Sequence, residues 1–448
     1  MTDARSDHVV FIVGGAVAGS EAAFQLASRG VTCAVMEQHD RPYGKIEDGL
    51  PRWHVDLRLQ EEKRIDEKLT HPRVHFIPRT RLGSDLTLDE IRSWNPSAII
   101  LANGAWRDRT FPLAGIDQYL GKGFVYQNSF VYWFNHYLES GYNGPRYVPE
   151  DEAIVVGGGL ASLDVVKILM LETVCRALEK RGERVSLLDL ERNGCRKVLT
   201  GMNLTLEDLG LKGCTLYYRR RVEDMPLAEM PDNASPEKEA QAQATRRKLL
   251  NNFADKYLFK FESLRAPVGF MAEKGHLTGL KMAHTRIENG RAVVSESTAD
   301  AVPAQMVISS IGSIPEPIPG VAMSGERYVV KDERTGELEG SDRVFVIGNA
   351  VTGKGNILVS RRHGRTVSQY MIEQYLAGAA SGYEEVFAGA ADETRRKMAA
   401  VVGRLSLQPP PSRQRVSELL SKIEYLQRRA GYGGDYRGWI DASRSNTI

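Results

Sequence analysis

The chain has 448 residues, of which 42% are hydrophobic and 26% are charged, and its formal net charge is +2. This length predicts two or three globular domains, and a charge so close to zero predicts no binding of nucleic acid or of an anionic membrane surface. The longest mostly apolar stretch, residues 9–27, is interrupted by glycines and Glu21, which excludes a membrane span there, and no secretion signal precedes it. We therefore expect a cytoplasmic protein.

Four cysteines are spread along the chain: Cys33, Cys175, Cys195 and Cys214. Their spacing forms no C-x-x-C pair for thiol redox chemistry and no cluster that could bind iron–sulfur or zinc. We expect isolated thiols and no metal site. Electrons that the protein transfers would then pass through an organic cofactor.

Residues 9–36 have the pattern of a strand, a glycine turn, a helix and a second strand. The turn consists of Gly14, Gly15, Ala16, Val17, Ala18 and Gly19. Small residues here allow backbone N–H groups and the helix N-terminus to approach a pyrophosphate. Glu37 follows the second strand, where a carboxylate can bind the hydroxyls of an adenosine ribose. This unit predicts a dinucleotide-binding domain.

Two segments follow before the next glycine turn. Residues 97–101 predict a strand of the first unit, because they are apolar and lead into a turn of small residues. Residues 116–152 are rich in aromatic residues and glycine, and we interpret them as partly a crossover and partly a wall on the substrate side. The aromatic residues that could form this wall are Tyr126, Phe130, Tyr132, Trp133 and Phe134.

A second unit of the same kind begins with the apolar residues 153–156. Its turn consists of Gly157, Gly158, Gly159, Leu160, Ala161 and Ser162. We expect this turn to bind the pyrophosphate of a nicotinamide nucleotide. The unit repeats the architecture of the first.

The strand that recognises the ribose of this nucleotide has two candidates. Residues 185–190 would offer Asp189 or Glu191, whose carboxylates favour the two free hydroxyls of NADH. Residues 215–218 lie further on and precede a run of three arginines, whose guanidinium groups match the 2′-phosphate of NADPH. The arginines are Arg219, Arg220 and Arg221.

Two further apolar segments, residues 306–310 and 344–347, lead into turns of small residues, and we assign both to the first unit. After about residue 378 the pattern changes to charged amphipathic helices, interrupted by prolines at 409–411. We interpret this tail as an addition. It packs either on its own chain, or on a partner or a second copy of the chain, which would form a homo-oligomer.

Several motifs resemble those of flavoproteins with two dinucleotide-binding domains. Besides the two glycine turns, Ala102-Asn103-Gly104-Ala105 resembles the turn that crosses between their domains. Residues 346–350 resemble their carboxy-terminal flavin motif, with Gly348, and with Asn349 where an acidic residue holds the ribityl chain. Gly355, Asn356 and Ile357 would then begin a helix whose positive end faces the flavin.

Two other segments narrow the resemblance. Residues 42–54 are similar to the flavin-side loop of adrenodoxin-type ferredoxin–NADP reductases, with Gly44 and Lys45 at the cofactor. Tyr218-Arg219-Arg220, followed by Met225-Pro226, resembles the nucleotide-specificity segment of the glutamate synthase small subunit. This resemblance implies FAD at the first glycine turn and NADPH at the second, with NADH as the alternative.

The resemblance also places a histidine, His54, near the flavin. There it implies a catalytic residue that tunes the ring or relays a proton. The competing interpretation is a structural histidine that packs beside Trp53.

As a fold, the resemblance implies an α/β protein with two Rossmann-like three-layer domains, the NAD(P)H domain being inserted into the FAD domain. A helical extension follows at the C-terminus. The expected divisions are residues 8–115 and 301–378 for the FAD-binding domain, 116–152 for the crossover, 153–300 for the NAD(P)H-binding domain and 379–448 for the extension.

Three hypotheses of function follow. In the leading one, NADPH passes a hydride to FAD N5, and the electrons continue to a ferredoxin-like acceptor protein or a partner subunit. In the second, a flavoprotein dehydrogenase or monooxygenase acts directly on a small organic substrate held by residues 116–152. In the third, the chain binds FAD as a structural or sensing module of a larger complex, and the tail is its docking element.

Overall fold

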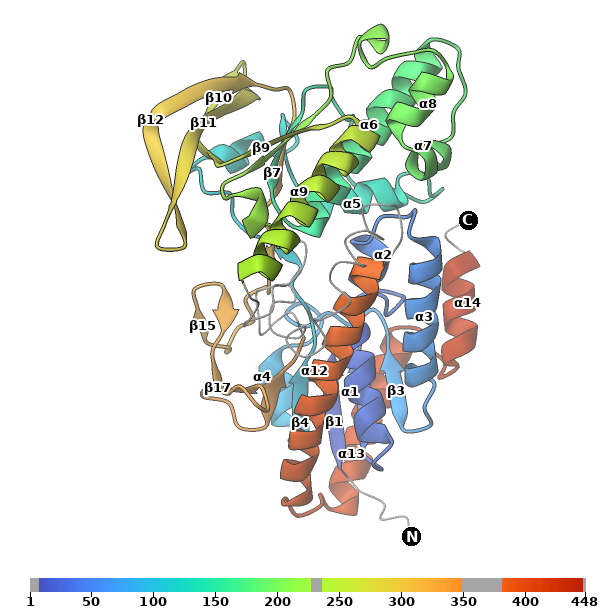
Figure 1. Ribbon diagram of the computed structural model, residues 1–448. Helices are drawn as coiled ribbons and strands as arrows, with labels where there is room; N and C mark the ends of the chain where they lie inside the picture. The colour runs from blue at the N-terminus through green and yellow to red at the C-terminus, as the bar shows by residue number, and fades with distance from the viewer. Residues whose placement is uncertain (1–7, 227–235, 349–380, 446–448) are drawn as a thin grey trace.

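Two parallel β-sheets organise the computed structural model, which describes residues 8–226, 236–348 and 381–445. The first sheet and its helices form the lower half of Figure 1, and the second sheet and its helices form the upper half. Each sheet is the middle of three layers. The predicted class, α/β with two three-layer domains, is confirmed.

The first sheet has seven strands, and five neighbouring ones are parallel. At one edge, β17 and β18 extend it as antiparallel strands. In spatial order the strands are β17 (Val330–Asp332), β18 (Glu337–Leu338), β19 (Val344–Val346), β4 (Ala98–Leu101), β1 (Val9–Val13), β2 (Thr32–Met36) and β3 (Val74–Ile77). The segments 97–101 and 344–347 therefore lie in the first sheet, as predicted.

Helices cover both faces of this sheet, which explains why β1 is apolar throughout. Val10 and Ile12 point to one face and Phe11 to the other, because side chains alternate along a strand. The first face packs against α1 (Val17–Ala27), α3 (Val55–Leu69), α12 (Ser381–Ser406) and α14 (Tyr436–Ser445). The second packs against α4 (Leu88–Ser93) and α13 (Arg413–Arg429). The described helices of the tail thus pack on their own chain, one of the two expected arrangements.

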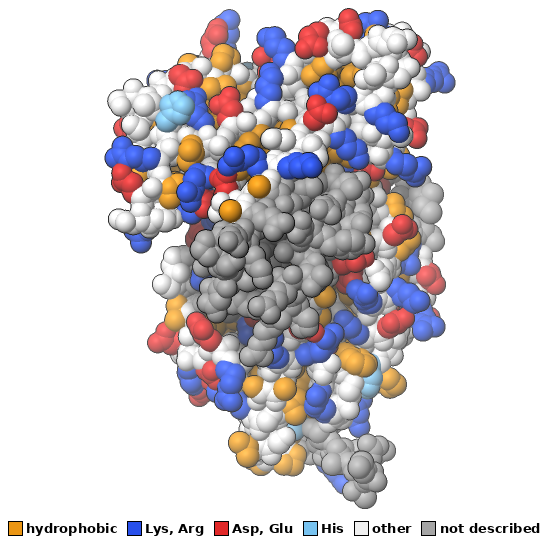
Figure 2. All heavy atoms as spheres, in the orientation of Figure 1, with side chains coloured by type: hydrophobic (Ala, Val, Ile, Leu, Met, Phe, Trp, Pro, Cys, Tyr) orange, Lys and Arg blue, Asp and Glu red, His pale blue; other side chains and the backbone are white. Residues whose placement is uncertain are grey.

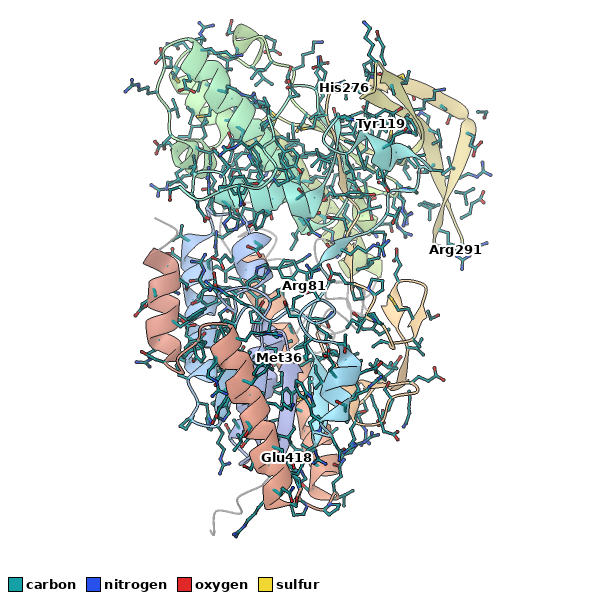
Figure 3. All side chains as sticks on the ribbon, turned by 180° about the vertical axis from the view of Figure 1, so that it is seen from behind. Met36, Arg81, Tyr119, His276, Arg291 and Glu418 are labelled. Carbon is teal, nitrogen blue, oxygen red and sulfur yellow. The ribbon has the colours of Figure 1, made fainter. Side chains whose placement is uncertain are left out.

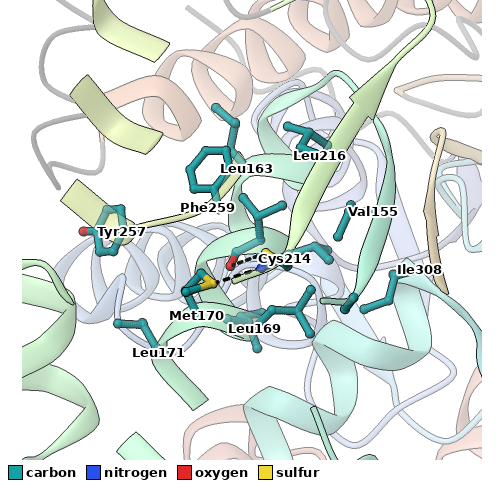
Figure 4. Close-up of a cluster of buried hydrophobic side chains, with 14 of the residues drawn as sticks. Val155, Leu163, Leu169, Met170, Leu171, Cys214, Leu216, Tyr257, Phe259 and Ile308 are labelled. Atoms are coloured by element: carbon teal, nitrogen blue, oxygen red, sulfur yellow. Dashed lines mark hydrogen bonds between the residues drawn. The ribbon is translucent and has the colours of Figure 1, made fainter. Parts of the chain in front are cut away.

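The second sheet has five parallel strands. In spatial order they are β6 (Phe124–Tyr126), β13 (Val307–Ser310), β7 (Ile154–Gly157), β8 (Thr215–Tyr218) and β9 (Lys260–Ser263). One face is covered by α5 (Gln127–His136), α6 (Leu160–Lys180), α7 (Leu187–Asn193), α8 (Cys195–Gly201) and α9 (Pro236–Tyr257). Figure 4 shows part of this core, in which the backbone N–H of Cys214 donates to the Met170 sulfur at 3.4 Å.

The other face of the second sheet is covered by a sheet rather than by helices. It consists of the antiparallel strands β10 (Arg265–Glu273), β11 (His276–Glu288) and β12 (Arg291–Pro303). Leu280 and Met282 of β11 are buried against the parallel strands. Arg291 marks the free end of the β11–β12 hairpin, which projects from the molecule in Figure 3.

Short elements connect these layers. β5 (Arg107–Asp108) pairs with β14 (Ser313–Ile314) where the chain crosses between the two parallel sheets. The remaining short elements are α2 (Lys45–Asp48), β15 (Met323–Ser324), β16 (Arg327–Tyr328) and the 3₁₀ turns η1 (Ile116–Tyr119), η2 (Glu207–Leu209) and η3 (Val222–Asp224).

Two predictions about strands are wrong. We expect residues 306–310 in the first sheet, but β13 pairs with β6 and β7 in the second. The expected boundary at residue 301 therefore assigns β13 to the wrong domain, because a short buried strand has the same apolar composition in either sheet. The candidate strand 185–190 is not formed either. The Ser186 hydroxyl accepts a hydrogen bond from the Asp189 N–H at 3.1 Å and caps α7.

Candidate functional site

A cleft lies along the carboxyl edge of the first sheet. The turns after β1, β2, β4 and β19 meet there, because the carboxyl ends of parallel strands share one edge. Met36, at the end of β2, and Arg81, in the loop after β3, mark its position in Figure 3. The predicted site residues that line the cleft are Gly14, Ala16, Ala18, Glu37, Gly44, Lys45, Asn103, Gly104, Ala105 and Gly348.

The first glycine turn brings the N-terminus of α1 to this cleft. Gly14 has a φ of +96°, and a Cβ there would lie 2.6 Å from the Ala102 carbonyl oxygen. A Cβ on Gly19 would lie 1.8 Å from the Gly14 carbonyl oxygen. Ala16 is the N-cap of α1, and no side chain in the described part of the chain caps it. The first-turn N–H groups of α1 therefore remain available to an anion.

Glu37 is buried and directed by the backbone. One of its oxygens, Oε2, accepts a hydrogen bond from the Gly15 N–H at 2.9 Å, and Oε1 accepts one from the His39 N–H at 3.1 Å. Burial raises the pKa of the Glu37 carboxyl, and these hydrogen bonds oppose the shift in part. The carboxyl is thus fixed at the wall of the cleft, where the sequence predicts a ribose.

The turn after β4 leaves one polar atom without a protein partner. The side-chain N–H of Asn103 donates to the Tyr328 hydroxyl at 3.2 Å, whereas its Oδ1 is buried and accepts no hydrogen bond from the described residues. A buried oxygen without a donor costs free energy, so this position favours a ligand that carries a hydroxyl or an N–H. With the helix N-terminus and Glu37, it fits the dinucleotide expected from the sequence.

The carboxy-terminal flavin motif is only partly within the described residues. Gly348 follows β19 with a φ of +67°, and a Cβ there would lie 3.0 Å from the Ala18 Cβ. Asn349, Gly355, Asn356 and Ile357 lie outside the described residues.

The second glycine turn lies at the carboxyl end of β7. A Cβ on Gly157 would lie 2.4 Å from the Ser310 carbonyl oxygen, and one on Gly158 would lie 2.3 Å from the Tyr218 ring. Gly159 has open space around it and caps α6, whose first turn contains Leu160, Ala161 and Ser162. The close packing requires glycine at the first two positions, and the open third position gives a ligand access to the N-terminus of α6.

Arg219 and Arg220 follow β8, which pairs directly with β7. Arg219 is exposed, and its guanidinium makes no hydrogen bond or ion pair with the described residues. Arg220 donates to the Gly290 carbonyl at 2.7 Å and lies 3.5 Å from the Asp224 carboxylate. Of the two, Arg219 is therefore the guanidinium that is available to a phosphate beside the second glycine turn.

The acidic alternative for ribose recognition has other roles. Asp189 is in the first turn of α7, where it accepts from the Ser186 hydroxyl at 2.7 Å. Glu191 accepts from the Lys167 ammonium at 2.6 Å. Because residues 187–193 form a helix, neither carboxylate lies at the end of a strand beside β7.

His54 lies at the boundary between the two domains and is not one of the described residues that line the cleft. It occupies the N-cap position of α3 without a capping hydrogen bond from its side chain, is buried beside Trp53, and its Nε2 lies 3.9 Å from the Asp164 carboxylate of α6. The structure therefore brings His54 to α6 rather than to the cleft wall.

The aromatic residues of segment 116–152 do not form the expected wall of a pocket. Phe130, Trp133 and Phe134 are buried in the core of the second domain. Tyr126 donates from its hydroxyl to Asp117 at 2.8 Å, and Tyr132 is partly exposed on α5. Aromatic density in the sequence was thus a signal of core packing.

Several residues that line the cleft belong to no motif in the sequence. Three of them come from α12, and the others from the loops after β3 and β14. Because α12 lies far along the sequence from the other elements of the cleft, only the tertiary fold brings it there. The residues are Thr80, Arg81, Leu82, Gly83, Glu316, Pro317, Ile318, Pro319, Val386, Phe387 and Ala390.

The described residues contain no group of three histidine, cysteine or acidic side chains that could hold a metal ion. None of their helices is long and apolar enough to cross a membrane. The four cysteines are free, and burial raises the pKa of Cys195 to about 12. Acidic and basic side chains are interspersed on the face shown in Figure 2.

Comparison with known proteins gives several relatives that are named as oxidoreductases or as glutamate synthase chains. No model of a known protein family matches the chain. It is 25% identical over 351 residues to the mitochondrial NADPH:adrenodoxin oxidoreductase of Arabidopsis thaliana, an alignment that covers 72% of this chain and 71% of that protein. It is 31% identical over 165 residues to the NADPH glutamate synthase small chain of Bacillus subtilis, covering 36% of this chain and 32% of that one.

A solved structure shares the fold. FprA from Mycobacterium tuberculosis in complex with NADPH matches with a TM-score of 0.66 at 15% identity, covering 94% of this chain and 90% of that chain. The match therefore extends over both parallel sheets.

Proposed function

We propose that this chain, a homologue of the adrenodoxin-type reductases and of the glutamate synthase small chain, is an FAD-dependent NADPH:acceptor oxidoreductase. One observation carries the proposal: each of the two parallel sheets ends in a glycine turn that opens a helix, and a cleft lies at the first of these turns. The names of the relatives supply NADPH as the reductant.

FAD would bind in the cleft of the first domain. The N-terminus of α1 would hold its pyrophosphate, and Glu37 would accept hydrogen bonds from the ribose hydroxyls. Asn103 Oδ1 would accept a hydrogen bond from the ribityl chain or the ring. When bound, FAD supplies the chemistry, because it accepts a hydride and passes electrons on.

NADPH would bind to the second glycine turn. The N-terminus of α6 would hold its pyrophosphate, and Arg219 would bind the 2′-phosphate. This arrangement requires no strand at residues 185–190, which form part of α7. Arg220 would not contact the phosphate directly, because its guanidinium already donates to the Gly290 carbonyl.

The electron acceptor would be a ferredoxin-like protein or a partner subunit. The relative from Arabidopsis thaliana is named for adrenodoxin, and the chain's four cysteines are isolated thiols rather than a cluster site. Electrons would therefore leave directly from the flavin. The buried positions of Phe130, Trp133 and Phe134 remove the feature that favoured a small organic substrate.

An anaerobic spectrum of the purified protein tests the proposal. We expect a flavin band at about 450 nm that NADPH bleaches within the mixing time and NADH bleaches far more slowly. Bleaching that needs an added small molecule would favour a dehydrogenase or monooxygenase. Bound flavin that neither nucleotide bleaches would contradict the reductase, and a protein that cannot be reconstituted with FAD would contradict the flavoprotein assignment.

A further inference from the structure

Lys45 reaches from the wall of the cleft to the second domain. It is the first residue of α2 and lines the cleft, and it is only partly exposed. Its ammonium donates to Asn128 Oδ1 at 3.1 Å and to Ser313 Oγ at 3.0 Å. Asn128 belongs to α5 of the second domain and Ser313 to β14, where the chain crosses between the domains. The charge is therefore fixed where the two domains meet.

This ammonium has neutral partners. Both of its hydrogen-bond acceptors are uncharged, and no carboxylate of the described residues lies within ion-pair distance of it. Two carboxylates face it from further away: Asp108 of β5 and Asp48 of α2. A partly buried cation without a contacting anion is costly, so its place at a ligand cleft points to negative charge on the ligand.

The hydrogen bonds around Lys45 fix the position of its ammonium group but do not neutralise its positive charge. The Asn128 backbone N–H donates to Asp108 at 3.3 Å, and the Asn128 side chain donates to the Trp106 carbonyl at 3.0 Å. Asn128 is thus fixed from both ends while its Oδ1 accepts from Lys45. The ammonium also lies 5.9 Å from the centre of the Trp106 ring, at the cleft wall.

We propose that Lys45 sets the electron affinity of the bound flavin, by placing a positive charge where the ring becomes negative on reduction. The inference rests on the proposed function, which puts FAD in this cleft. A hydride brings two electrons and one proton, so the ring gains one negative charge and no proton has to leave Lys45. The same ammonium could instead contact the FAD pyrophosphate, although the N-terminus of α1 already provides a phosphate site. Sulfite affinity and FAD affinity together distinguish an ammonium at the flavin ring from one at the pyrophosphate.

Sulfite tests the charge at the ring without any nucleotide or acceptor, because it adds to oxidised flavin and leaves a negative charge on the ring. We expect Lys45→Gln, which keeps a hydrogen-bonding side chain, to weaken sulfite binding to the FAD-loaded protein by roughly tenfold or more. Lys45→Arg keeps the charge and should stay within about threefold of the wild type. Equal sulfite affinity of Lys45→Gln and wild type would overturn the proposal.

The dissociation constant of FAD identifies the pyrophosphate alternative. If Lys45→Gln weakens FAD binding and leaves sulfite affinity unchanged, the ammonium contacts the phosphates and the proposal is wrong. Failure of NADPH to bleach the wild type contradicts the proposed function alone, since sulfite binding needs only bound FAD. A protein that binds no FAD overturns both.

The pH dependence of sulfite binding distinguishes a role of the Lys45 charge from a purely structural role, which would not change with pH. Burial lowers the pKa of Lys45 to about 8 against the opposing effect of Asp108 and Asp48. The ratio of wild-type to Lys45→Gln sulfite affinity should therefore fall towards one as the pH rises through about 8. The pKa of Asp108 is raised by burial to about 6, so Asp108 is charged near pH 8 and raises the pKa of Lys45. An Asp108→Asn variant should therefore move this change in the ratio to a lower pH. A ratio that is constant from pH 6 to 9 would contradict the role of charge.

Discussion

In the proposed NADPH site, the choice between NADPH and NADH would depend on one exposed side chain, that of Arg219. Its guanidinium makes no ion pair or hydrogen bond with the described residues, so no protein group would compete with a 2′-phosphate for it. We expect Arg219→Ala to raise the KM for NADPH roughly 10- to 100-fold, since a hydrogen bond to a charged group contributes about 1.5–3 kcal/mol. The KM for NADH should change by less than about threefold. Steady-state reduction of a dye by each nucleotide measures both.

The neighbouring Arg221 provides a matched control for this prediction. It is exposed like Arg219, but its Nε donates to the Asp224 carboxylate at 3.1 Å. Arg221→Ala should therefore leave the preference for NADPH nearly unchanged. If Arg219→Ala does not alter the ratio of the two KM values and Arg221→Ala does, the phosphate site lies on the other side of this loop.

At the scale of elements, α14 shows that the tail is part of the first domain. Ile440 is buried in the same cluster as β1 and α1, and the Trp439 indole donates to the Asp40 carbonyl at 2.8 Å. Tyr436 donates to Asp66 of α3 at 2.7 Å. These contacts hold α14 against the loop that leads from Asp40 to the cleft.

We expect Ile440→Ala to destabilise the isolated protein by about 2–5 kcal/mol, because it leaves a cavity in a closed core. Urea unfolding of the first domain measures the loss, and retention of FAD should weaken in parallel. Arg437→Ala, at an exposed position of the same helix, serves as the control and should change the stability by less than about 0.5 kcal/mol. An unchanged stability of Ile440→Ala would mean that α14 docks on another molecule.

The same elements show which parts of the fold a sequence can predict. The two glycine turns were located from local patterns, because the chain must avoid Cβ contacts there as close as 1.8 Å at Gly19. The assignment of β13 to a sheet and the role of α12 in the cleft depend on contacts between distant residues, which local patterns do not contain. Ser186 is a third case, because it caps a helix within an apolar stretch that has the composition of a strand.

In the candidate site, too, some residues can be located from local sequence patterns and others only from contacts between distant residues. Glu37 directly follows β2, and Asn103 lies in the turn after β4, so both line the cleft at positions that the sequence pattern predicts. Asp108 and Asn128 have no motif, and only the meeting of two domains places them beside Lys45. His54 is the intermediate case, since its loop was recognised but its side chain lies against α6.

At the scale of the whole molecule, the segment of residues 45–54 joins the two domains along α5. The side chain of Asn135 donates to the carbonyls of Glu47 and Leu50 at 2.9 and 3.0 Å, and its oxygen accepts from the Arg52 N–H at 2.9 Å. The Arg52 guanidinium lies 4.5 Å from the centre of the Phe134 ring. These contacts fix Lys45 and the cleft wall relative to the second domain, so hydride transfer between the two proposed nucleotide sites would depend on them.

His136 makes this contact between the domains sensitive to pH. It is buried on α5 between two carboxylates: Nε2 lies 3.1 Å from Asp48 of the first domain, and Nδ1 lies 2.8 Å from Glu139. Burial alone lowers the pKa of His136, but the hydrogen bonds to Asp48 and Glu139 outweigh it, and the net shift is upward. A raised pKa in the folded protein means that protonated His136 stabilises the contact between the domains. This stabilisation is complete below about pH 6.5, the ordinary pKa of histidine, and is lost as the pH rises through the raised value.

Comparison of the wild type with His136→Gln tests this coupling. We expect the variant to be less stable by about 1–3 kcal/mol near pH 6, and the difference should shrink steadily above that pH as the wild type loses its proton. Hydrogen exchange of the α2 amides reports the contact locally, and protection there should fall with rising pH in the wild type more steeply than in His136→Gln. Asp48→Asn removes the partner on the first domain and should also flatten the profile, which places the effect at the boundary. A difference between wild type and His136→Gln that is the same at pH 6 and pH 9 would mean that His136 contributes packing and not charge to the contact between the domains.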